Sequence, residues 1–326
     1  MTDFLSRLPL AQHRVDRDHA RRADPDLWNA LRADPGARLV VLHDGRALVE
    51  HPRDEETGLV APPRLALVPF DHRLASLAAG EPHYLGITTE ARVDAPAGTA
   101  VASIAIDPAL DGTGFADELA DLADAGFTGL REVGELLSPL DAGLYVEALA
   151  LDRWHAAHPY SPRSGAPARR EHAGWVISDD AGSGLVFPRT DPAVIVTIVD
   201  ADDRILLGAN REWTPRRYSL LAGFVEPGES FEAAVVREVY EESGARVVDP
   251  RYIGSQPWPF PASIMVGFTC RLHPDQSPDD VRPDDDEIVD LRWFTREEIA
   301  NEATLLPGRL SIARAMIEEW YGGPLG

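Results

Sequence analysis

The sequence contains a single cysteine, Cys270, among 326 residues. One cysteine excludes an intrachain disulfide and a four-cysteine zinc site, so we expect a small apolar side chain in a strand. Basic residues are also few, because 31 Lys and Arg face 54 Asp and Glu, for a formal net charge of -23. This charge opposes broad electrostatic binding to nucleic acid or to an anionic membrane surface. A phosphate-bearing ligand would have to be bound locally, by a metal ion or a few placed donors.

Long hydrophobic runs are missing too. The start of the chain has no apolar stretch of signal-peptide length, and nothing later approaches the roughly 18 residues that a membrane helix needs. We therefore expect a cytoplasmic protein with no membrane partner. The chain does have 44% hydrophobic residues over 326 positions, which is enough for two domain cores.

Changes in residue pattern predict an α+β N-terminal domain in residues 1–158. Two alternating apolar runs flank Asp44 and Gly45, a strong hairpin signal. Other apolar runs have the period of strands or of helices. The predicted strands lie within 58–70, 83–91 and 99–107, and the predicted helices within 115–127 and 140–158.

Two further segments follow. Residues 159–190 are rich in Gly, Pro, Ser and Arg and have little periodicity, which is typical of a connector. In residues 191–326, strand patterns alternate with helical ones, so we predict a mixed sheet with helices packed on it.

Acidic side chains crowd one predicted helix of this last domain. Glu238, Glu241 and Glu242 lie within five positions, with no lysine nearby, after Ser230 as a helix N-cap residue. At about 100° per residue the three carboxylates share one arc, and each like-charge pair costs roughly 0.2–0.5 kcal/mol. They form either a solvated acidic face or a site for a divalent cation, whose preferred ligands are carboxylate oxygens.

The wider pattern resembles the signature box of the Nudix hydrolases. Gly223 and Glu229 are followed by Arg237-Glu238-Val239-x-Glu241-Glu242-x-Gly244 at the family spacing. The resemblance implies an α/β/α sandwich that binds Mg²⁺ or Mn²⁺ and hydrolyses a diphosphate. It implies metal binding by Glu238 and Glu242, direct or supporting contact by Glu241, a carbonyl ligand from Ala222, and Glu242 nearest the attacking water. Glu229 and Arg237 match a bracing pair, while Ala245 departs from the bulky aliphatic residue usual there.

A second motif follows the box. In this motif, SQPWPFPAS at residues 255–263, three prolines stiffen the backbone and hold the rings of Trp258 and Phe260 as flat surfaces. The alternative interpretation is a Pro-rich surface loop without a binding role. The stretch SQPWPFPAS resembles the motif of the NADH pyrophosphatase branch of the Nudix hydrolases, and this implies that it lines the nucleotide pocket. The implied pocket residues are Gln256, Pro257, Trp258, Pro259, Phe260, Pro261, Ala262 and Ser263.

Other stretches, FPRTDPAVI, DLRWF and LSIARAMIE, also resemble that branch. Carried over by position, Phe224 would stack on the nicotinamide, and Phe187 would reach its other face across a dimer interface. Phe187 keeps the stacking plane of the tyrosine found in relatives and lacks its hydroxyl. Glu287 would contact substrate or metal, although it could also belong to a solvated acidic loop, and Ala313 would contact substrate through its backbone.

The chain departs from the branch at a zinc ribbon that many members carry. Ser161, Ser164, Asp179 and Gly182 stand at the spacing of its four cysteines. Hydroxyls and one carboxylate are poor Zn²⁺ ligands beside thiolates, so we predict a degenerate, metal-free ribbon. The nearby His155, His158 and His172 could rebuild a zinc site, but packing of His155 and His158 at a helix end is the alternative.

The resemblance thus implies a homodimeric NAD(H) diphosphatase that releases nicotinamide mononucleotide and AMP from NADH or NAD⁺. One alternative is removal of the 5′ NAD cap from RNA by the same site, against which the net charge argues. A non-catalytic dinucleotide sensor is the other, although a sensor need not retain the metal carboxylates.

Overall fold

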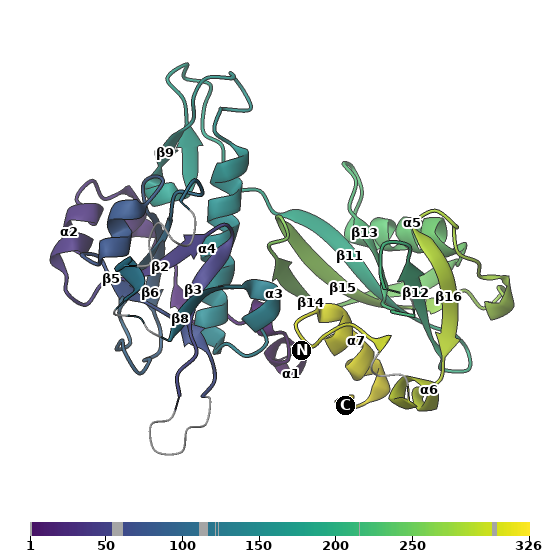
Figure 1. The fold of residues 1–326 in the computed structure, drawn as a ribbon. Coiled ribbons are helices and arrows are strands. Elements are labelled where there is room, and N and C mark those ends of the chain that lie inside the picture. The colour runs from purple at the N-terminus through teal and green to yellow at the C-terminus, as the bar shows by residue number, and fades with distance from the viewer. Residues whose placement is uncertain are drawn as a thin grey trace. The chain divides into compact units, whose positions relative to one another are not determined.

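The computed structural model describes residues 2–53, 61–110, 117–120, 122, 124–214, 216–301 and 305–326. The chain forms two compact units (Figure 1). The C-terminal unit comprises residues 1–11, 190–258 and 263–326, and the N-terminal unit comprises residues 12–189 and 259–262. The sequence boundaries expected at 158 and 190 therefore differ in two respects: residues 159–189 cluster with the N-terminal unit, and the first eleven residues cluster with the C-terminal one.

The C-terminal unit is built on a mixed sheet in the order β14-β15-β11-β12-β16, with β13 also paired to β11. Its central pair, β11 and β15, is parallel, and the β12–β16 pair is antiparallel. The strands are β11 (Asp191–Val199), β12 (Ile205–Asn210), β13 (Leu221–Phe224), β14 (Val247–Trp258), β15 (Ser263–Leu272) and β16 (Ile288–Phe294). The helices are α1 (Thr2–Ser6), α5 (Phe231–Ser243), α6 (Arg296–Asn301) and α7 (Ile312–Tyr321).

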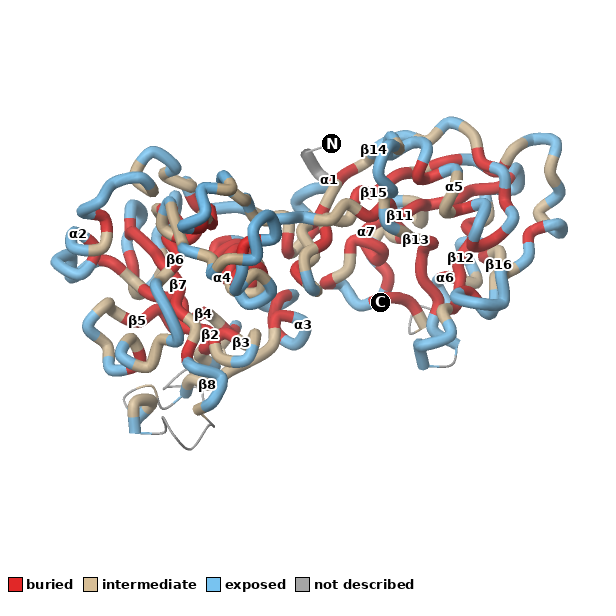
Figure 2. Tube along the Cα trace, turned by 90° about the horizontal axis from the view of Figure 1, so that it is seen from above, coloured by how far each residue is buried: buried red, intermediate tan, exposed pale blue. Residues whose placement is uncertain are grey.

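The two faces of this sheet carry separate cores because side chains alternate along each strand. On β11, Val194 and Val196 pack with Val235 and Val239 of α5, whereas Ile195 packs with residues of α7. Figure 2 shows runs of buried residues along the strands of this unit and in α7. This arrangement confirms the predicted α/β/α sandwich.

The N-terminal unit contains an eight-stranded sheet and the long helix α4 (Pro139–Ala157). Its strands are β1 (Val15–Asp16), β2 (Arg38–His43), β3 (Arg46–Glu50), β4 (Arg64–Leu65), β5 (Val68–Pro69), β6 (His83–Thr88), β7 (Ala100–Ala105) and β8 (Ala125–Gly129), with β9 (Arg169–Glu171) and β10 (Val176–Ser178) forming a separate pair. The shorter α-helices of this unit are α2 (Leu27–Ala33) and α3 (Leu130–Val133), and its 3-10 turns are His19–Ala23, Arg73–Leu77, Asp117–Leu119 and His172–Gly174. The 3-10 turns Pro9–Ala11 and Pro278–Asp280 lie in the C-terminal unit. The predicted hairpin is present, since Asp44 and Gly45 both adopt positive φ between β2 and β3.

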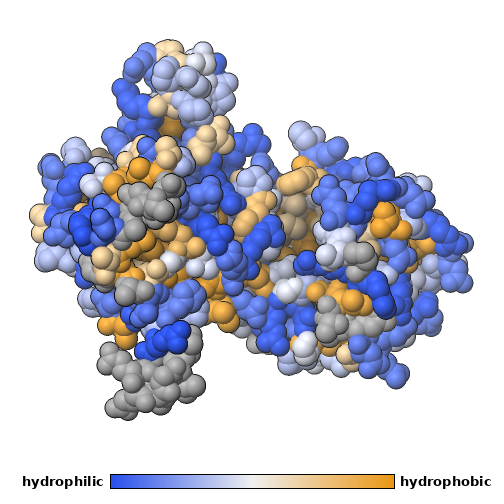
Figure 3. Space-filling view, viewed as in Figure 1, coloured by the Kyte–Doolittle hydropathy of each residue, from blue (hydrophilic) through white to orange (hydrophobic). Residues whose placement is uncertain are grey.

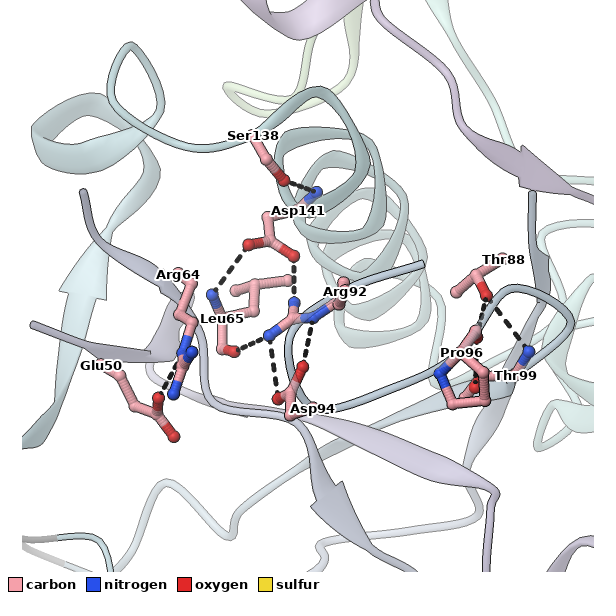
Figure 4. Close-up of polar contacts among 10 residues, drawn as sticks. All are labelled: Glu50, Arg64, Leu65, Thr88, Arg92, Asp94, Pro96, Thr99, Ser138 and Asp141. Atoms are coloured by element: carbon pink, nitrogen blue, oxygen red, sulfur yellow. Dashed lines mark hydrogen bonds and ion pairs between the residues drawn. The ribbon is translucent and has the colours of Figure 1, made fainter. Parts of the chain in front are cut away.

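A buried ion pair joins a loop of this unit to the start of α4 (Figure 4). Arg92 donates to both oxygens of Asp94, to the carbonyl of Leu65 and to Asp141. Asp141 also accepts from the backbone N–H of Leu65, while its own N–H donates to the N-cap residue Ser138. The side chains of Arg92 and Asp141 are 7% and 3% exposed, so every contact here replaces lost hydration.

One helix prediction is wrong. Within the segment 115–127, the described residues form a 3-10 turn at Asp117–Leu119 and then enter strand β8. Strand β8 pairs along β3, from Arg46 opposite Gly129 to Glu50 opposite Ala125. The free edge of β3 supplies backbone partners that a helix would leave unused, and Gly126 disfavours helix in any case. The helix predicted within 140–158 is confirmed by α4.

No helix in the described part of the chain combines the length and apolar character needed to cross a bilayer.

Candidate active site

The glutamate helix forms as predicted. The Ser230 hydroxyl caps α5 by accepting from the N–H of Ala233, and Gly244 ends the helix with φ 64°. Val235 and Val239 are fully buried against the sheet, and Ala245 is also fully buried in the same core. The small residue at the family's aliphatic position is therefore packed, and the acidic residues of α5 project along the neighbouring arc.

Gly223 on β13 allows this helix to approach the strand closely. A Cβ atom built at position 223 would lie 2.0 Å from the carboxyl carbon of Glu238. A side chain there would displace the end of the Glu238 side chain, so glycine leaves space for the carboxylate in its observed position. The strand and the helix are thus fitted to each other at the point where Glu238 projects.

Arg237 binds several carboxylates at once. Its guanidinium lies 2.5 Å from Glu229, 2.9 Å from Glu238 and 2.8 Å from Glu241, and it donates to the carbonyl of Phe224 at 3.0 Å. The hydrogen bond from Arg237 lowers the pKa of Glu229 to about 2. Arginine can contact several carboxylates in this way because its planar guanidinium carries donors in a rigid fork. The bracing role expected for Glu229 and Arg237 matches these contacts.

Glu242 is the buried carboxylate of the group, 6% exposed. Its Oε2 atom has no hydrogen-bond partner among the described residues. Burial raises the pKa of Glu242 to about 8, reinforced by the charges of Glu287, Glu238 and Asp284, while a backbone N–H of Ala222 opposes the shift. A cation bound here would stabilise the ionised Glu242 carboxylate, because it would compensate both the missing hydrogen bond and the repulsion from the neighbouring carboxylates.

The donor set therefore fits a hard divalent cation, since it consists of carboxylate oxygens with a nearby strand backbone. Within the described residues, no three Asp, Glu, His or Cys side chains already converge as a metal site. The ion pairs of Arg237 explain this for Glu238 and Glu241, which are held toward the guanidinium. Both would have to turn away from Arg237 to join Glu242 around a cation. On the face shown in Figure 3, the surface of this unit is mostly hydrophilic, with hydrophobic patches between.

The predicted pocket motif forms a hairpin and not a loop. Gln256, Pro257 and Trp258 lie in β14, with Trp258 opposite Ser263 of β15. Gln256 is fully buried and donates to the carbonyl of Leu310 at 3.0 Å, while its Oε1 has no partner in the described part of the chain. Phe224 is exposed at the end of β13, and the Ala313 side chain is buried in the core. The Ala313 N–H donates to the Ser311 hydroxyl.

Some predicted residues belong to the N-terminal unit. The hairpin tip, Pro259 to Ala262, clusters there, and the ring of Phe260 lies 4.0 Å from the Arg131 guanidinium. Phe187 also belongs to this unit and is exposed. The other members of the predicted site belong to the C-terminal unit. The predicted site residues are therefore divided between the two units.

The degenerate ribbon is organised around Asp179. The Asp179 carboxylate accepts from the hydroxyls of Ser164, at 2.8 Å, and Ser183, and the Ser161 hydroxyl lies 3.3 Å from that of Ser183. These hydroxyls, Ser161 first, hold the pKa of Asp179 well below its usual range. Ser161, Ser164 and Asp179 are brought together as their spacing predicts, whereas Ser183 takes the place expected for Gly182. We call this cluster of Ser161, Ser164, Asp179 and Ser183 the serine–aspartate hub.

The nearby histidines have other partners. His155 Nε2 bonds to the carbonyl of Gly174 at 2.8 Å, and its ring stacks on that of His83 at 4.6 Å. His158 Nδ1 bonds to the carbonyl of Trp154 at 2.7 Å. Burial lowers the pKa of His155 to about 4. These contacts favour packing of His155 and His158 at the end of α4 over binding of zinc.

Comparison with known proteins identifies the family. Residues 189–316 match the model of the NUDIX domain, and residues 36–154 match that of the NADH pyrophosphatase-like rudimentary NUDIX domain. Together these matches span most of the chain, which therefore belongs to the Nudix family. The rudimentary domain beside the Nudix domain places it in the NADH pyrophosphatase branch.

Two curated relatives have similar sequences. A protein of Mycobacterium bovis named "NAD-capped RNA hydrolase NudC" is 44% identical over 203 residues, covering 59% of this chain and 64% of its own. A human protein named "NAD-capped RNA hydrolase NUDT12" is 34% identical over 200 residues, covering 56% of this chain and 42% of its own. The matched region is thus less than two thirds of either relative's length.

Solved structures of Nudix hydrolases are more distant. A Nudix hydrolase from Nitrosomonas europaea is 22% identical, with a TM-score of 0.39, over 51% of this chain and 94% of its own.

Proposed function

We propose that the chain is a divalent-metal-dependent hydrolase that cleaves the diphosphate of NAD-type dinucleotides, giving nicotinamide mononucleotide and AMP. The observation that carries this proposal is the arrangement around Glu242. A buried carboxylate oxygen without a partner lies among further carboxylates, beside a glycine that admits Glu238. The SQPWPFPAS hairpin and the relatives named as NAD-capped RNA hydrolases support the dinucleotide as substrate.

In this proposal Mg²⁺ or Mn²⁺ would be held by Glu238, Glu241, Glu242 and Glu287, with the carbonyl of Ala222. A bound divalent cation neutralises diphosphate charge and activates water, which suits a chain with a net charge of -23. Arg237 and Glu229 brace the loop that precedes α5, and Gly223 leaves space for the Glu238 carboxylate. No zinc is expected.

The remaining residues serve substrate binding. Phe224 is exposed on β13 and would stack on the nicotinamide, and the exposed Phe187 of a second protomer would cover the other face. Trp258 and the other residues of the hairpin would line the nucleotide pocket, with Gln256 as a buried polar group beneath it. A homodimer and a cytoplasmic location belong to the same proposal.

The NAD cap of RNA is a second candidate substrate, favoured by the names of both curated relatives. The excess of acidic residues opposes contact with the phosphates of the RNA body, so a capped RNA would be recognised mainly by its dinucleotide end. The discriminating assay compares NADH, NAD⁺, ADP-ribose and NAD-capped RNA at equal concentration with Mg²⁺ or Mn²⁺.

Faster turnover of NADH or NAD⁺ would identify the free dinucleotide as the substrate. Faster turnover of capped RNA would identify the cap. Binding of NAD(H) without turnover at any divalent metal would instead support a non-catalytic sensor and refute hydrolysis.

A further inference from the structure

Asn210, the last residue of β12, and Arg211, which follows it, contact the loop that carries Glu287. Asn210 Nδ2 donates to Glu287 Oε1 at 3.0 Å, and the N–H of Arg211 donates to the Glu287 carbonyl at 2.9 Å. The Arg211 guanidinium donates to the carbonyl of Asp286 at 2.8 Å and to that of Asp285. Side chain and backbone of Glu287 are therefore both held from β12.

An irregularity in the sheet makes these contacts possible. The register between β12 and β16 shifts between Ala209 and Asn210, so that Asn210 lies opposite Ile288. Bulges of this kind redirect side chains at the ends of strands. Here the shift turns the Asn210 amide toward the residue before β16, which is Glu287.

The Asn210 amide has a fixed orientation. Its Oδ1 accepts from the N–H of Glu212 at 2.9 Å, and this leaves the NH₂ group facing Glu287. A neutral amide orients a carboxylate without cancelling its charge, whereas an arginine would compete with a cation for the carboxylate. Glu229, paired with Arg237, illustrates the second case. The contact with Asn210 therefore uses one oxygen of the Glu287 carboxylate and leaves the other for a further ligand.

Arg211 acts on the loop backbone. The run Asp284 to Glu287 consists of four acidic residues, and like charges this close repel each other. Asp284 organises the run from within, because its carboxylate accepts from the N–H groups of Asp286 and Ile288. Arg211 adds a positive charge and fixes two carbonyls of the run, which holds it beside the buried Glu242.

We propose that Asn210 and Arg211 are positioning residues that hold Glu287 ready to bind the divalent cation. The inference rests on the proposed function in assuming that the cation binds beside Glu242 and Glu287. Asn210 aims the carboxylate, and Arg211 fixes the loop from which it projects. Loss of either residue weakens the binding of the metal before any substrate is present.

The test is a Mn²⁺ titration of the full chain without substrate. Loss of a residue that orients a metal ligand commonly costs about 10- to 100-fold in metal affinity. We expect that loss in Asn210→Ala, with Asn301→Ala as the matched control that binds like the wild type. In a Glu287→Gln background, Asn210→Ala should produce little further loss, because the two residues act through one contact. Activity lost by Asn210→Ala at low Mn²⁺ should return at saturating Mn²⁺, which a folding defect would not allow.

Arg211 is tested by a pair of substitutions. Arg211→Lys keeps the charge but not the fork that reaches two carbonyls, so it should weaken Mn²⁺ binding as Arg211→Met does. Hydrogen exchange at residues 284–288 should rise in both variants and stay unchanged in the exposed control Arg271→Met. This measurement needs no metal, so it also tests variants that bind none.

Two results would overturn the positioning role and leave the proposed function untouched. One is Mn²⁺ affinity equal to the wild type in Asn210→Ala. The other is a full additional loss of Mn²⁺ affinity when Asn210→Ala is added to Glu287→Gln. Mn²⁺ binding by the wild type without turnover of any dinucleotide would overturn the proposed function and leave this inference standing. A wild type that binds no Mn²⁺ would overturn both.

Discussion

Gly223 and Glu238 are fitted to each other: a Cβ at position 223 would lie 2.0 Å from the Glu238 carboxyl carbon. We expect the added methyl of Gly223→Ala to restrict the space in which this carboxylate turns from Arg237 toward a cation and so to lower activity about 100-fold, the effect of a displacement near 1 Å. Mn²⁺ affinity should fall as well. The control is Gly308→Ala, at which an added Cβ meets nothing within 4 Å. Equal activity of the two variants would contradict the fitted contact.

The serine–aspartate hub should hold the connector without metal. Asp179→Ala removes the acceptor shared by Ser164 and Ser183, so we expect faster protease cleavage within residues 159–189. Asp180→Ala is the matched control, because Asp180 is exposed and forms one surface ion pair with Arg169. Treatment with a zinc chelator should leave the cleavage rate of the wild type unchanged. One zinc per chain in protein purified without added metal would contradict this account.

The buried carboxylate of Glu147 should make stability depend on pH. Burial raises the pKa of Glu147 to about 7, against the opposing charges of Arg17 and Arg22. The folded chain therefore binds this proton more tightly than the unfolded chain does, and the associated stability is present below about pH 4.5 and lost as pH rises through about 7. We expect the free energy of unfolding to fall by about 3 kcal/mol more in the wild type than in Glu147→Gln over this interval.

Denaturant unfolding of both proteins at several pH values provides the measurement. Other groups with shifted pKa values cancel in the difference between wild type and variant. Glu132→Gln, which replaces an exposed partner of Arg46, should follow the wild type. Parallel curves for wild type and Glu147→Gln would show that Glu147 is ionised in the folded chain.

The ion pair of Arg92 and Asp141 should matter for folding of the N-terminal unit. Removing one member leaves the other charge buried, which typically costs about 3–5 kcal/mol. We therefore expect Asp141→Ala to lower the melting temperature strongly, whereas Asp71→Ala, at an exposed position, should change it little. Equal changes in melting temperature for Asp141→Ala and Asp71→Ala would mean that water replaces the lost carboxylate beside Arg92.

Local signals predicted much of the C-terminal unit correctly. Ser230 and Gly244 mark the ends of α5, and the glutamate spacing within it predicts one acidic arc, because both features depend only on helix geometry. The helix predicted within 115–127 is wrong for the described residues, because Ala125 to Phe127 pair with the free edge of β3, which is a tertiary partner.

Contacts around the candidate site that depend on tertiary partners could not be predicted from the sequence either. Ser161, Ser164 and Asp179 could be placed by their spacing, but Ser183 depends on the turn that brings it to the Asp179 carboxylate. Asn210 and Arg211 gave no sequence signal, since their contact with the Glu287 loop arises from a register shift between two strands about 80 residues apart. Burial of Gln256 likewise depends on the distant carbonyl of Leu310.

The central claim is tested most directly by Glu242→Gln. The wild type and this variant are incubated with NADH and Mg²⁺ or Mn²⁺, and AMP is measured. The account predicts AMP from the wild type and a loss of about 100-fold or more in the variant, the size typical of losing one preorganised electrostatic contact. No AMP from the wild type, or equal AMP from both proteins, would contradict it.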